Sequence, residues 1–401
     1  MMGLADTPRG NRLHIGIFGK RNAGKSSLIN ALTGQQTALV SEVAGTTTDP
    51  VYKSMEIHGI GPCVLIDTAG FDDTGELGRK RIEKTEEAAA KTDIALVIFS
   101  GDDFSEEMSW VSRLRAQKTP VIPVVGKKDL KSEKELEQYC AEVEKTCEEK
   151  PLVVSTFSGE GIGEIRERIL RSLPEDYDQK SLTGDMVSAG DLVLLVMPQD
   201  IQAPKGRLIL PQVQTIRELL DKKCLVMSCV TDRLEETLKA LSRAPKLIIT
   251  DSQVFGEVYE KKPPESRLTS FSVLMAGSKG DISYFAESAA AIERLREDSR
   301  VLIAEACTHA PLKEDIGREK LPRLLRKKAG QGLQVDIVAG VDFPQDLTPY
   351  DLVIHCGACM FNRKHVLSRV ERARSQGVPM TNYGVALAAL SGILTKIDLP
   401  K

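Results

Sequence analysis

Residues 19–26 read GKRNAGKS and determine how the first part of this chain is expected to fold. They fit the pattern G-x-x-x-x-G-K-[ST], which is typical of a loop that wraps around nucleotide phosphates. An apolar run precedes the loop and a helical apolar pattern follows it, so we expect a strand, the loop and a helix in that order. Backbone N–H groups and the helix N-terminus would face the phosphates. The residues expected around the nucleotide are Gly19, Asn22, Ala23, Gly24, Lys25, Ser26 and Ser27.

Two side chains of this loop have specific tasks in the predicted site. We expect Lys25 to reach the β- and γ-phosphates and the Ser26 hydroxyl to ligate Mg²⁺. The loop therefore predicts a site for a nucleoside triphosphate with its magnesium ion.

The composition is that of an ordinary globular protein, with 41% hydrophobic and 28% charged residues over 401 positions. This length predicts two or three domains. A net charge of −3 gives no indication of nucleic-acid or membrane binding. We find no apolar run of membrane-spanning length and no signal-peptide core, so we expect a cytoplasmic protein. Its eight cysteines are not expected to form a disulfide framework, which raises the question of metal binding.

Two polar segments after the loop are expected to act as switches. Residues 44–49 read AGTTTD, and a threonine there can add its hydroxyl to Mg²⁺; we favour Thr47, although Thr46 and Thr48 are equally available. A short apolar strand at 63–66 then ends in the sequence DTAG. Asp67 is placed to hold Mg²⁺ through water, and Gly70 can present its N–H to the γ-phosphate.

A third motif predicts which base is bound. The buried strand expected at 121–125 leads into GKKD, where Asp129 can accept two hydrogen bonds from guanine that adenine cannot supply. The stem of Lys127 would pack along the base. Gly126 stands where this motif normally has Asn or Thr, so a side chain that braces the phosphate loop is missing. The last nucleotide motif is expected at 155–157, where only Ser155 matches the usual sequence.

These motifs, in this order over residues 10–173, resemble a GTPase of the translation-factor-like class. The specific likeness is to the potassium-stimulated subgroup of TrmE and Era, in which Asn22 would occupy the position that coordinates K⁺. Phe71 follows DTAG where Ras-like enzymes carry their water-orienting Gln. The resemblance implies hydrolysis without that Gln, and Glu76 is a candidate to position the water, although a solvated loop residue is the alternative.

Residues 180–262 alternate apolar and helical patterns and predict a compact α/β unit without a catalytic motif. Cys224 and Cys229 lie there and are expected to be small buried residues rather than ligands. A polar stretch at 172–181 and the residues KKPP at 261–264 are the expected boundaries of this unit.

Residues 266–401 predict a doubly wound parallel sheet, with strands at 271–276, 300–306, 335–339 and 351–354 and helices at about 283–297 and 362–375. Two of these strands end in ligand-type residues, CTH at 307–309 and HCGAC at 355–359. Because sites lie past the carboxyl ends of parallel strands, we expect the two clusters to converge. From the residues alone, structural zinc and an iron–sulfur cluster are about equally supported.

The Cys-x-His and His-Cys-x-x-Cys clusters behind an N-terminal GTPase resemble the FeFe-hydrogenase maturation GTPases over the whole chain. That resemblance implies a GTPase domain, a dimerisation domain and a cluster-binding domain. It implies a 4Fe–4S cluster on Cys307, Cys356 and Cys359, with His309, His355 or Glu305 open as the fourth ligand. It further implies a homodimeric scaffold that receives a diiron precursor from two radical-SAM maturases and passes it to the apo FeFe-hydrogenase.

Two further features have alternative interpretations. Basic residues cluster at 318–328 and 363–374, where a solvated helix face is the plainer interpretation and a docking surface for an acidic partner the functional one. The main alternative for the whole chain is an RNA-acting GTPase, for tRNA modification or ribosome assembly, with a structural zinc site. It explains the first segment equally well but leaves the paired Cys/His clusters unexplained, and no RNA-binding module is evident.

Overall fold

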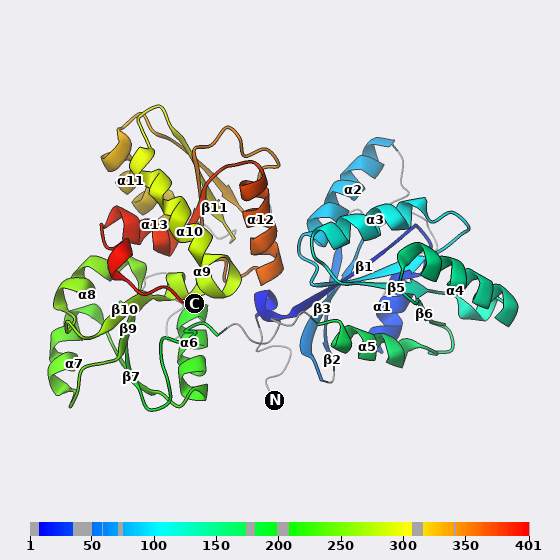
Figure 1. Ribbon diagram of the computed structural model, residues 1–401, viewed down its shortest axis with the longest axis horizontal. Coiled ribbons are helices and arrows are strands. Elements are labelled where there is room, and N and C mark those ends of the chain that lie inside the picture. Colours follow the sequence, from blue (N-terminus) through cyan, green and yellow to red (C-terminus); the bar gives the residue numbers. More distant parts are fainter. Residues whose placement is uncertain are drawn as a thin grey trace. The chain divides into compact units, whose positions relative to one another are not determined.

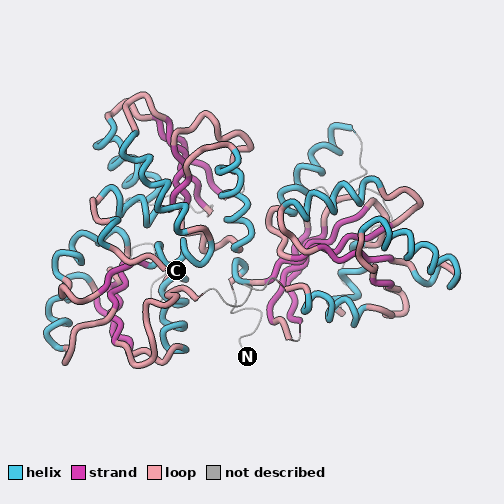
Figure 2. Tube along the Cα trace, in the orientation of Figure 1, coloured by secondary structure: helices cyan, strands magenta, loops and turns pink. Residues whose placement is uncertain are grey.

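The computed structural model describes residues 8–34, 50–57, 59–70, 75–173, 181–198, 208–306, 316–340 and 342–400. The chain forms two compact units, Met1–Asp178 and Gln179–Lys401 (Figure 1). Helices alternate with strands along much of both units, as the tube in Figure 2 shows. Among the residues described, no helix combines the length and the apolar character that a membrane crossing needs.

The first unit is built on a six-stranded sheet with the order β2-β3-β1-β4-β5-β6. All neighbours are parallel except β2, which pairs antiparallel with β3. Strands β1, β4 and β5 are buried along their whole length because helices cover both faces. The strands are β1 Leu13–Gly19, β2 Val51–Ile57, β3 Gly61–Asp67, β4 Ile94–Phe99, β5 Val121–Val125 and β6 Leu152–Val153.

Two separate hydrophobic clusters show which helices cover which face. One contains apolar residues of α1 and α5, and the other contains residues of α2, α3 and α4. The sheet therefore lies between two helical layers, an architecture that leaves the carboxyl edge of the strands open for a ligand. The helices are α1 Lys25–Thr33, α2 Gly75–Ala89, α3 Ser105–Ala116, α4 Glu133–Cys147 and α5 Ile162–Arg171.

The second unit contains two four-stranded sheets, and every strand pair in them is parallel. The first has the order β10-β9-β7-β8, from β7 Leu192–Val196, β8 Leu225–Cys229, β9 Leu247–Thr250 and β10 Arg267–Ser270. The second has the order β12-β11-β13-β14, from β11 Arg300–Glu305, β12 Gln334–Ala339, β13 Leu352–His355 and β14 Met380–Asn382.

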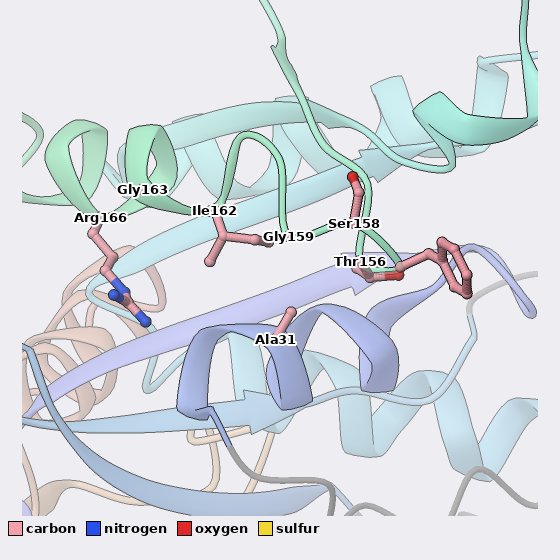
Figure 3. Close-up of a pocket in the computed structure, with 8 residues that line it drawn as sticks. Ala31, Thr156, Ser158, Gly159, Ile162, Gly163 and Arg166 are labelled. Atoms are coloured by element: carbon pink, nitrogen blue, oxygen red, sulfur yellow. The ribbon is translucent and has the colours of Figure 1, made fainter.

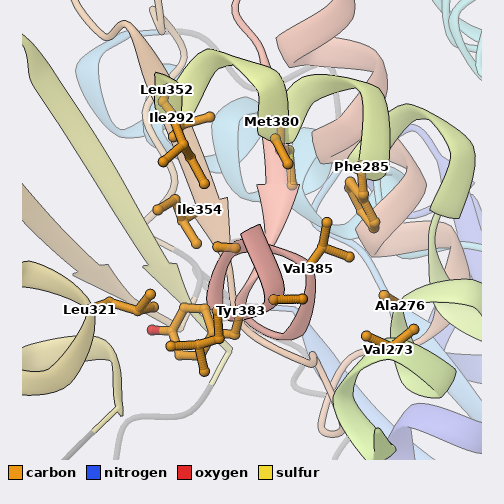
Figure 4. Close-up of a cluster of buried hydrophobic side chains, with 14 of the residues drawn as sticks. Val273, Ala276, Phe285, Ile292, Leu321, Leu352, Ile354, Met380, Tyr383 and Val385 are labelled. Atoms are coloured by element: carbon orange, nitrogen blue, oxygen red, sulfur yellow. The ribbon is translucent and has the colours of Figure 1, made fainter. Parts of the chain in front are cut away.

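One buried cluster joins the two sheets of this unit. It runs from Leu194 and Ile248 in the first sheet to Ile303 and Ile354 in the second. Helices contribute Val273, Phe285 and Val385, which Figure 4 shows together with Ile354. A shared core of this kind couples the two sheets into one folding unit. The helices are α6 Leu210–Asp221, α7 Leu234–Ala240, α8 Phe255–Lys261, α9 Phe271–Lys279, α10 Ile282–Ser288, α11 Leu321–Ala329, α12 Arg363–Ser375 and α13 Tyr383–Leu390.

The strand expected at 271–276 is wrong, because these residues form the first part of α9. The Ser270 side chain accepts a hydrogen bond from the Val273 N–H and so caps the helix N-terminus. A short apolar run is buried in the same way by a core helix and by a core strand, so periodicity could not separate the two. The strand of this region is β10, which pairs with β9.

Candidate functional site

The phosphate loop connects the central strand β1 to α1, as the sequence predicts. Asn22 and Gly24 have positive φ angles of 59° and 99°, which turn the loop tightly enough for backbone N–H groups to line its inside. Lys25 is buried, and its Nζ donates hydrogen bonds to the carbonyl oxygens of Gly19 and Lys20, each at 2.8 Å. These two carbonyl groups therefore hold the ammonium group inside the loop, where a phosphate group would also bind.

Ser26 and Asp67 meet at the carboxyl edge of the sheet. Strands β1 and β3 are parallel with Ile17 opposite Asp67, and the Ser26 hydroxyl donates to the Asp67 carboxylate at 2.6 Å. Burial raises the pKa of Asp67, whereas the Ser26 hydrogen bond and the Lys25 charge oppose that rise. A hydroxyl and a carboxylate at this separation fit the ligand preference of Mg²⁺, directly or through water.

Several predicted residues around the γ-phosphate cannot be placed. Thr46, Thr47, Thr48 and Phe71 lie outside the described residues, and so does the side chain of Glu76. Gly70 is described and follows β3 three residues after Asp67. Their proposed roles stay predictions.

The segment expected to read the base is organised by Ser155. The Ser155 hydroxyl is buried and donates to the Asp129 carboxylate at 2.6 Å, while it accepts from the Ser158 N–H at 3.2 Å. Lys127 has a φ of 57°, which turns the chain between β5 and Asp129. The single residue that matches the last nucleotide motif is thus the one that orients the predicted guanine acceptor.

Gly126 faces the phosphate loop. A Cβ atom built on it would lie 3.6 Å from the carbonyl oxygen of Ala23 and 3.8 Å from Cγ2 of Ile98, which is ordinary van der Waals contact. A side chain at this position would therefore point at the loop without a clash. Because residue 126 is glycine, no side chain makes this contact.

Sequence reasoning missed one brace of the phosphate loop. Lys20 forms an ion pair at 2.9 Å with Glu107, a carboxylate on α3 whose side chain is wholly buried. Glu107 shares a helical face with Trp110, Val111 and Leu114, all buried. The sequence did contain a signal for this contact, namely an acidic residue on an otherwise apolar helical face. A buried carboxylate requires a partner, so a cation could have been expected beside it.

An open groove of about 460 Å³ lies beside the base-reading segment, between α1 and the loop that leads into α5 (Figure 3). Phe157 on its rim is 92% exposed. The groove adjoins the predicted position of the base rather than that of the phosphates. Its lining residues are Ala31, Thr156, Phe157, Ser158, Gly159, Ile162, Gly163 and Arg166.

The second candidate site is at the carboxyl ends of β11 and β13. These strands are parallel neighbours with Ala304 opposite His355, so the residues that follow them start at the same edge. The Cys356 sulfur accepts hydrogen bonds from the N–H groups of Ala306 at 3.0 Å and Ala358 at 3.4 Å. Without metal, burial raises the pKa of the Cys356 thiol to about 11, and these hydrogen bonds act in the opposite direction.

His355 is buried, and both of its ring nitrogens are engaged. Nε2 accepts a hydrogen bond from the Arg369 guanidinium at 2.9 Å, so Nδ1 carries the proton that is donated to the Cys356 carbonyl oxygen at 2.9 Å. Burial, together with the Arg369 charge, lowers the pKa of His355 to about 3. As a metal ligand, His355 would have to give up one of these two hydrogen bonds.

Glu305 ends β11 with its side chain buried. Its carboxylate accepts from the Arg318 guanidinium at 3.1 Å and from the Tyr383 hydroxyl at 3.4 Å. These contacts orient the carboxylate and pair it with the positive charge of Arg318.

Cys307 and His309 lie outside the described residues, and within the described ranges no three His, Cys, Asp or Glu side chains form a metal-binding group. The residues that are described still fit a thiolate-ligated metal. Cys356 and Cys359 have the Cys-x-x-Cys spacing and form no disulfide within the described part of the chain, and two backbone N–H groups point at the sulfur of Cys356. Cys307 directly follows Ala306, the donor of the shorter hydrogen bond.

The loop between β1 and α1, the Ser26–Asp67 pair and the Ser155–Asp129 pair together define a P-loop GTPase domain. The comparisons agree, because residues 14–128 match the family model described as "50S ribosome-binding GTPase". GTPase Der of Wolinella succinogenes is 37% identical over 171 residues, which cover 40% of this chain and 36% of Der. The tRNA modification GTPase MnmE of Heliobacterium modesticaldum is 36% identical over 166 residues, which cover 40% of this chain and 34% of MnmE.

The chain thus spans about a third of the length of these curated relatives. A structure of an Aquifex aeolicus Era variant bound to GDP and AlF4⁻ covers 57% of this chain and 98% of its own, at 20% identity and a TM-score of 0.37.

The rest of the chain matches two other family models. Residues 182–280 match the hydrogen maturase F dimerization domain, and residues 283–398 match the hydrogen maturase F tetramerization domain. Together these matches cover more than half of the chain, and they follow a GTPase domain. The chain belongs to the hydrogen maturase F family. The expected resemblance to a hydrogenase maturation GTPase is confirmed.

Proposed function

We propose that this protein is a GTP-hydrolysing scaffold of FeFe-hydrogenase maturation that binds a 4Fe–4S cluster in its C-terminal part and carries the diiron precursor of the hydrogenase cofactor. The observation that carries the proposal is the coexistence of two sites in one chain of this family. One is an organised nucleotide site, and the other is a Cys-x-x-Cys segment at a strand end with N–H groups directed at a sulfur.

The GTPase part of the proposal follows from the positions of charge. Lys25 would hold the β- and γ-phosphates, and Ser26 and Asp67 would hold Mg²⁺, which neutralises developing charge when bound. Gly70, Thr46 and Thr47 would complete the γ-phosphate end, with K⁺ at Asn22. Asp129, oriented by Ser155, would select guanine over adenine.

The metal part assigns Cys307, Cys356 and Cys359 as the cluster thiolates. His309, His355 and Glu305 remain candidates for the fourth position, or for contacts with the cargo. The chemistry that the cluster would supply is an exchangeable coordination site at which a second metal fragment can bind. We further propose that two radical-SAM maturases supply the diiron precursor, that the apo-hydrogenase receives it, and that the scaffold works in the cytoplasm.

The oligomerisation that the two family models indicate can be made specific. We propose a homodimer formed through β8, an edge strand of its sheet. Leu225 and Met227 on β8 are 55% and 42% exposed, and Leu220 at the end of α6 is 52% exposed. An edge strand with exposed apolar side chains is a template for pairing with another strand. Leu225→Lys with Met227→Lys should give a smaller oligomer by light scattering, whereas unchanged mass would contradict the proposed interface.

The cluster assignment is tested by metal analysis of the full chain, purified and reconstituted without oxygen. We expect about four irons and four sulfides per chain, lost in Cys307→Ala and retained in Cys224→Ala, the matched control at a buried cysteine just before β8. One zinc without iron would overturn the cluster assignment. Salt-dependent micromolar binding of tRNA or ribosomal RNA would instead favour the RNA-acting alternative.

A further inference from the structure

The segment 356–361, which carries both described thiols of the C-terminal site, is held from one side by Lys279. This lysine ends α9 and is buried, and its Nζ donates to the carbonyl oxygens of Phe361 at 2.5 Å and Cys359 at 3.4 Å. The last residue of a helix in the neighbouring part of the core therefore fixes the backbone at the second cysteine.

Arg369 of α12 holds the same segment from another side. Its guanidinium donates to His355 Nε2 at 2.9 Å and to the Gly340 carbonyl oxygen at 2.6 Å. It also lies over the rings of Phe343 and Phe361, with 4.6 and 4.7 Å from its central carbon to the ring centroids. This cation therefore contacts His355, which immediately precedes the segment, and Phe361, which ends it.

The charge of Arg369 is buried without an anion. The side chain is 3% exposed, its Nε has no hydrogen-bond partner, and no carboxylate of the described residues forms an ion pair with it. A neutral imidazole, a carbonyl and two aromatic faces stabilise a cation only in part. An unpaired buried cation is unfavourable, so its retention indicates that an anion completes the site.

The backbone adds further positive character at the same place. The N–H groups of Ala306 and Ala358 point at the Cys356 sulfur, and Ala358 adopts a φ of 51°, which L-residues rarely do. Two dipoles and two buried cations therefore surround one short loop, with the thiols as the groups of that loop that can become negative.

The geometry points to Lys279 and Arg369 as positioning residues that hold the segment 356–361 and compensate the negative charge of a thiolate-ligated metal centre. This inference rests on the proposed metal site but not on the kind of metal that fills it. Neither residue touches the metal. Each acts through the loop and through its charge, which favours the thiolate form and, for a redox-active centre, the reduced state.

The first test uses the metal-free full chain and Co²⁺ alone, followed by the charge-transfer absorption of Co²⁺ bound to thiolate. We expect Lys279→Met to weaken Co²⁺ binding about tenfold and Lys279→Arg to restore it within about threefold. Arg369→Gln, which keeps a donor for His355 but removes the charge, should also weaken binding. Arg374→Met is the matched control on α12, because Arg374 is ion-paired with Asp281 on the surface. The inference would be overturned if folded Lys279→Met and Arg369→Gln bound Co²⁺ as tightly as the wild-type chain. It would also be overturned if Lys279→Arg lost as much Co²⁺ affinity as Lys279→Met.

The second test measures the midpoint potential of the reconstituted cluster. Loss of one buried positive charge in Lys279→Met should lower the equilibrium constant for reduction of the cluster about tenfold. The midpoint potential should then fall by about 59 mV for a one-electron couple. An unchanged potential in Lys279→Met at full iron content would contradict the charge role. If the wild-type chain forms no cluster but the Co²⁺ pattern holds, the proposed cluster fails and the charge inference stands.

Discussion

The nucleotide site and the thiol site are built at the same kind of place, the carboxyl edge of a parallel sheet, yet their loops are fixed differently. The phosphate loop is braced by an ion pair between Lys20 and the buried side chain of Glu107. The thiol segment is braced by Arg369, whose hydrogen-bond partners are neutral. The brace of the phosphate loop therefore pairs a cation with a carboxylate, whereas the brace of the thiol segment is a cation without an anionic partner among the described residues. Four substitutions in the nucleotide site test how its loop is held and what its residues contribute.

The largest effect is expected from Lys25→Ala. The ammonium is the buried charge that the phosphates would meet, so its loss should slow GTP hydrolysis by about a hundredfold or more, as measured by phosphate release. Iron and sulfide content should not change, because the thiol site lies in the other unit. Hydrolysis at the wild-type rate would contradict the assignment of Lys25.

Lys20→Ala is expected to destabilise the first unit by about 3 kcal/mol, because it leaves the Glu107 carboxylate buried and unpaired. Denaturant unfolding of the full chain, followed by Trp110 fluorescence, measures this unit because Trp110 lies on α3 with its side chain buried in the core of the unit. Lys20→Ala combined with Glu107→Leu should recover much of the loss. If the double variant is as unstable as the single one, the ion pair is not the cause.

Ser155→Ala should weaken GTP binding about tenfold without changing the fold. Its hydroxyl donates to Asp129, and a hydrogen bond to a charged group contributes about 1.5–3 kcal/mol. Titration with a fluorescent GTP analogue measures the effect. Exposed Ser158 is the control, and Ser158→Ala is expected to bind within about twofold of wild type. Equal losses in both variants would point to the loop as a whole rather than to the Asp129 contact.

The smallest effect is a gain. Gly126→Asn places a side chain where a Cβ atom has ordinary contacts and where the phosphate loop is in reach. One added hydrogen bond to that loop should tighten nucleotide binding about fivefold. Gly126→Ala, which adds the Cβ without the amide, should change little. Weaker binding in Gly126→Asn would mean that the glycine is required for close approach.

Much of the first site could be predicted because its ligand dictates a contiguous pattern. The loop at residues 19–26 begins at the end of β1, Asp67 is the last residue of β3, and Asp129 follows β5; because these strands run in the same direction, their carboxyl ends lie at one edge of the sheet. The Glu107 brace was missed because its partner lies 87 positions away, and nothing local links the two.

The second unit shows where local patterns fail. Residues 271–276 are apolar except for Ser272, which suits a core strand and a core helix equally, and only the Ser270 cap and the packing of α9 in the shared core favoured the helix. The parallel sheet around β11 and β13 was predictable, because each apolar run is short and is followed by a helix.

Three features could be predicted from the sequence alone: the GTPase motifs, the alternation of strands and helices, and the Cys-x-x-Cys spacing at the end of a strand. Such features depend on residues that are close together along the chain, so a local stretch of sequence is enough to predict them. The folded structure was needed to show that Lys279 and Arg369 hold the thiol segment, that both ring nitrogens of His355 form hydrogen bonds, and that Ser155 orients Asp129. These contacts join residues from different elements, and burial, which gives them their strength, exists only once the sheets and helices have packed.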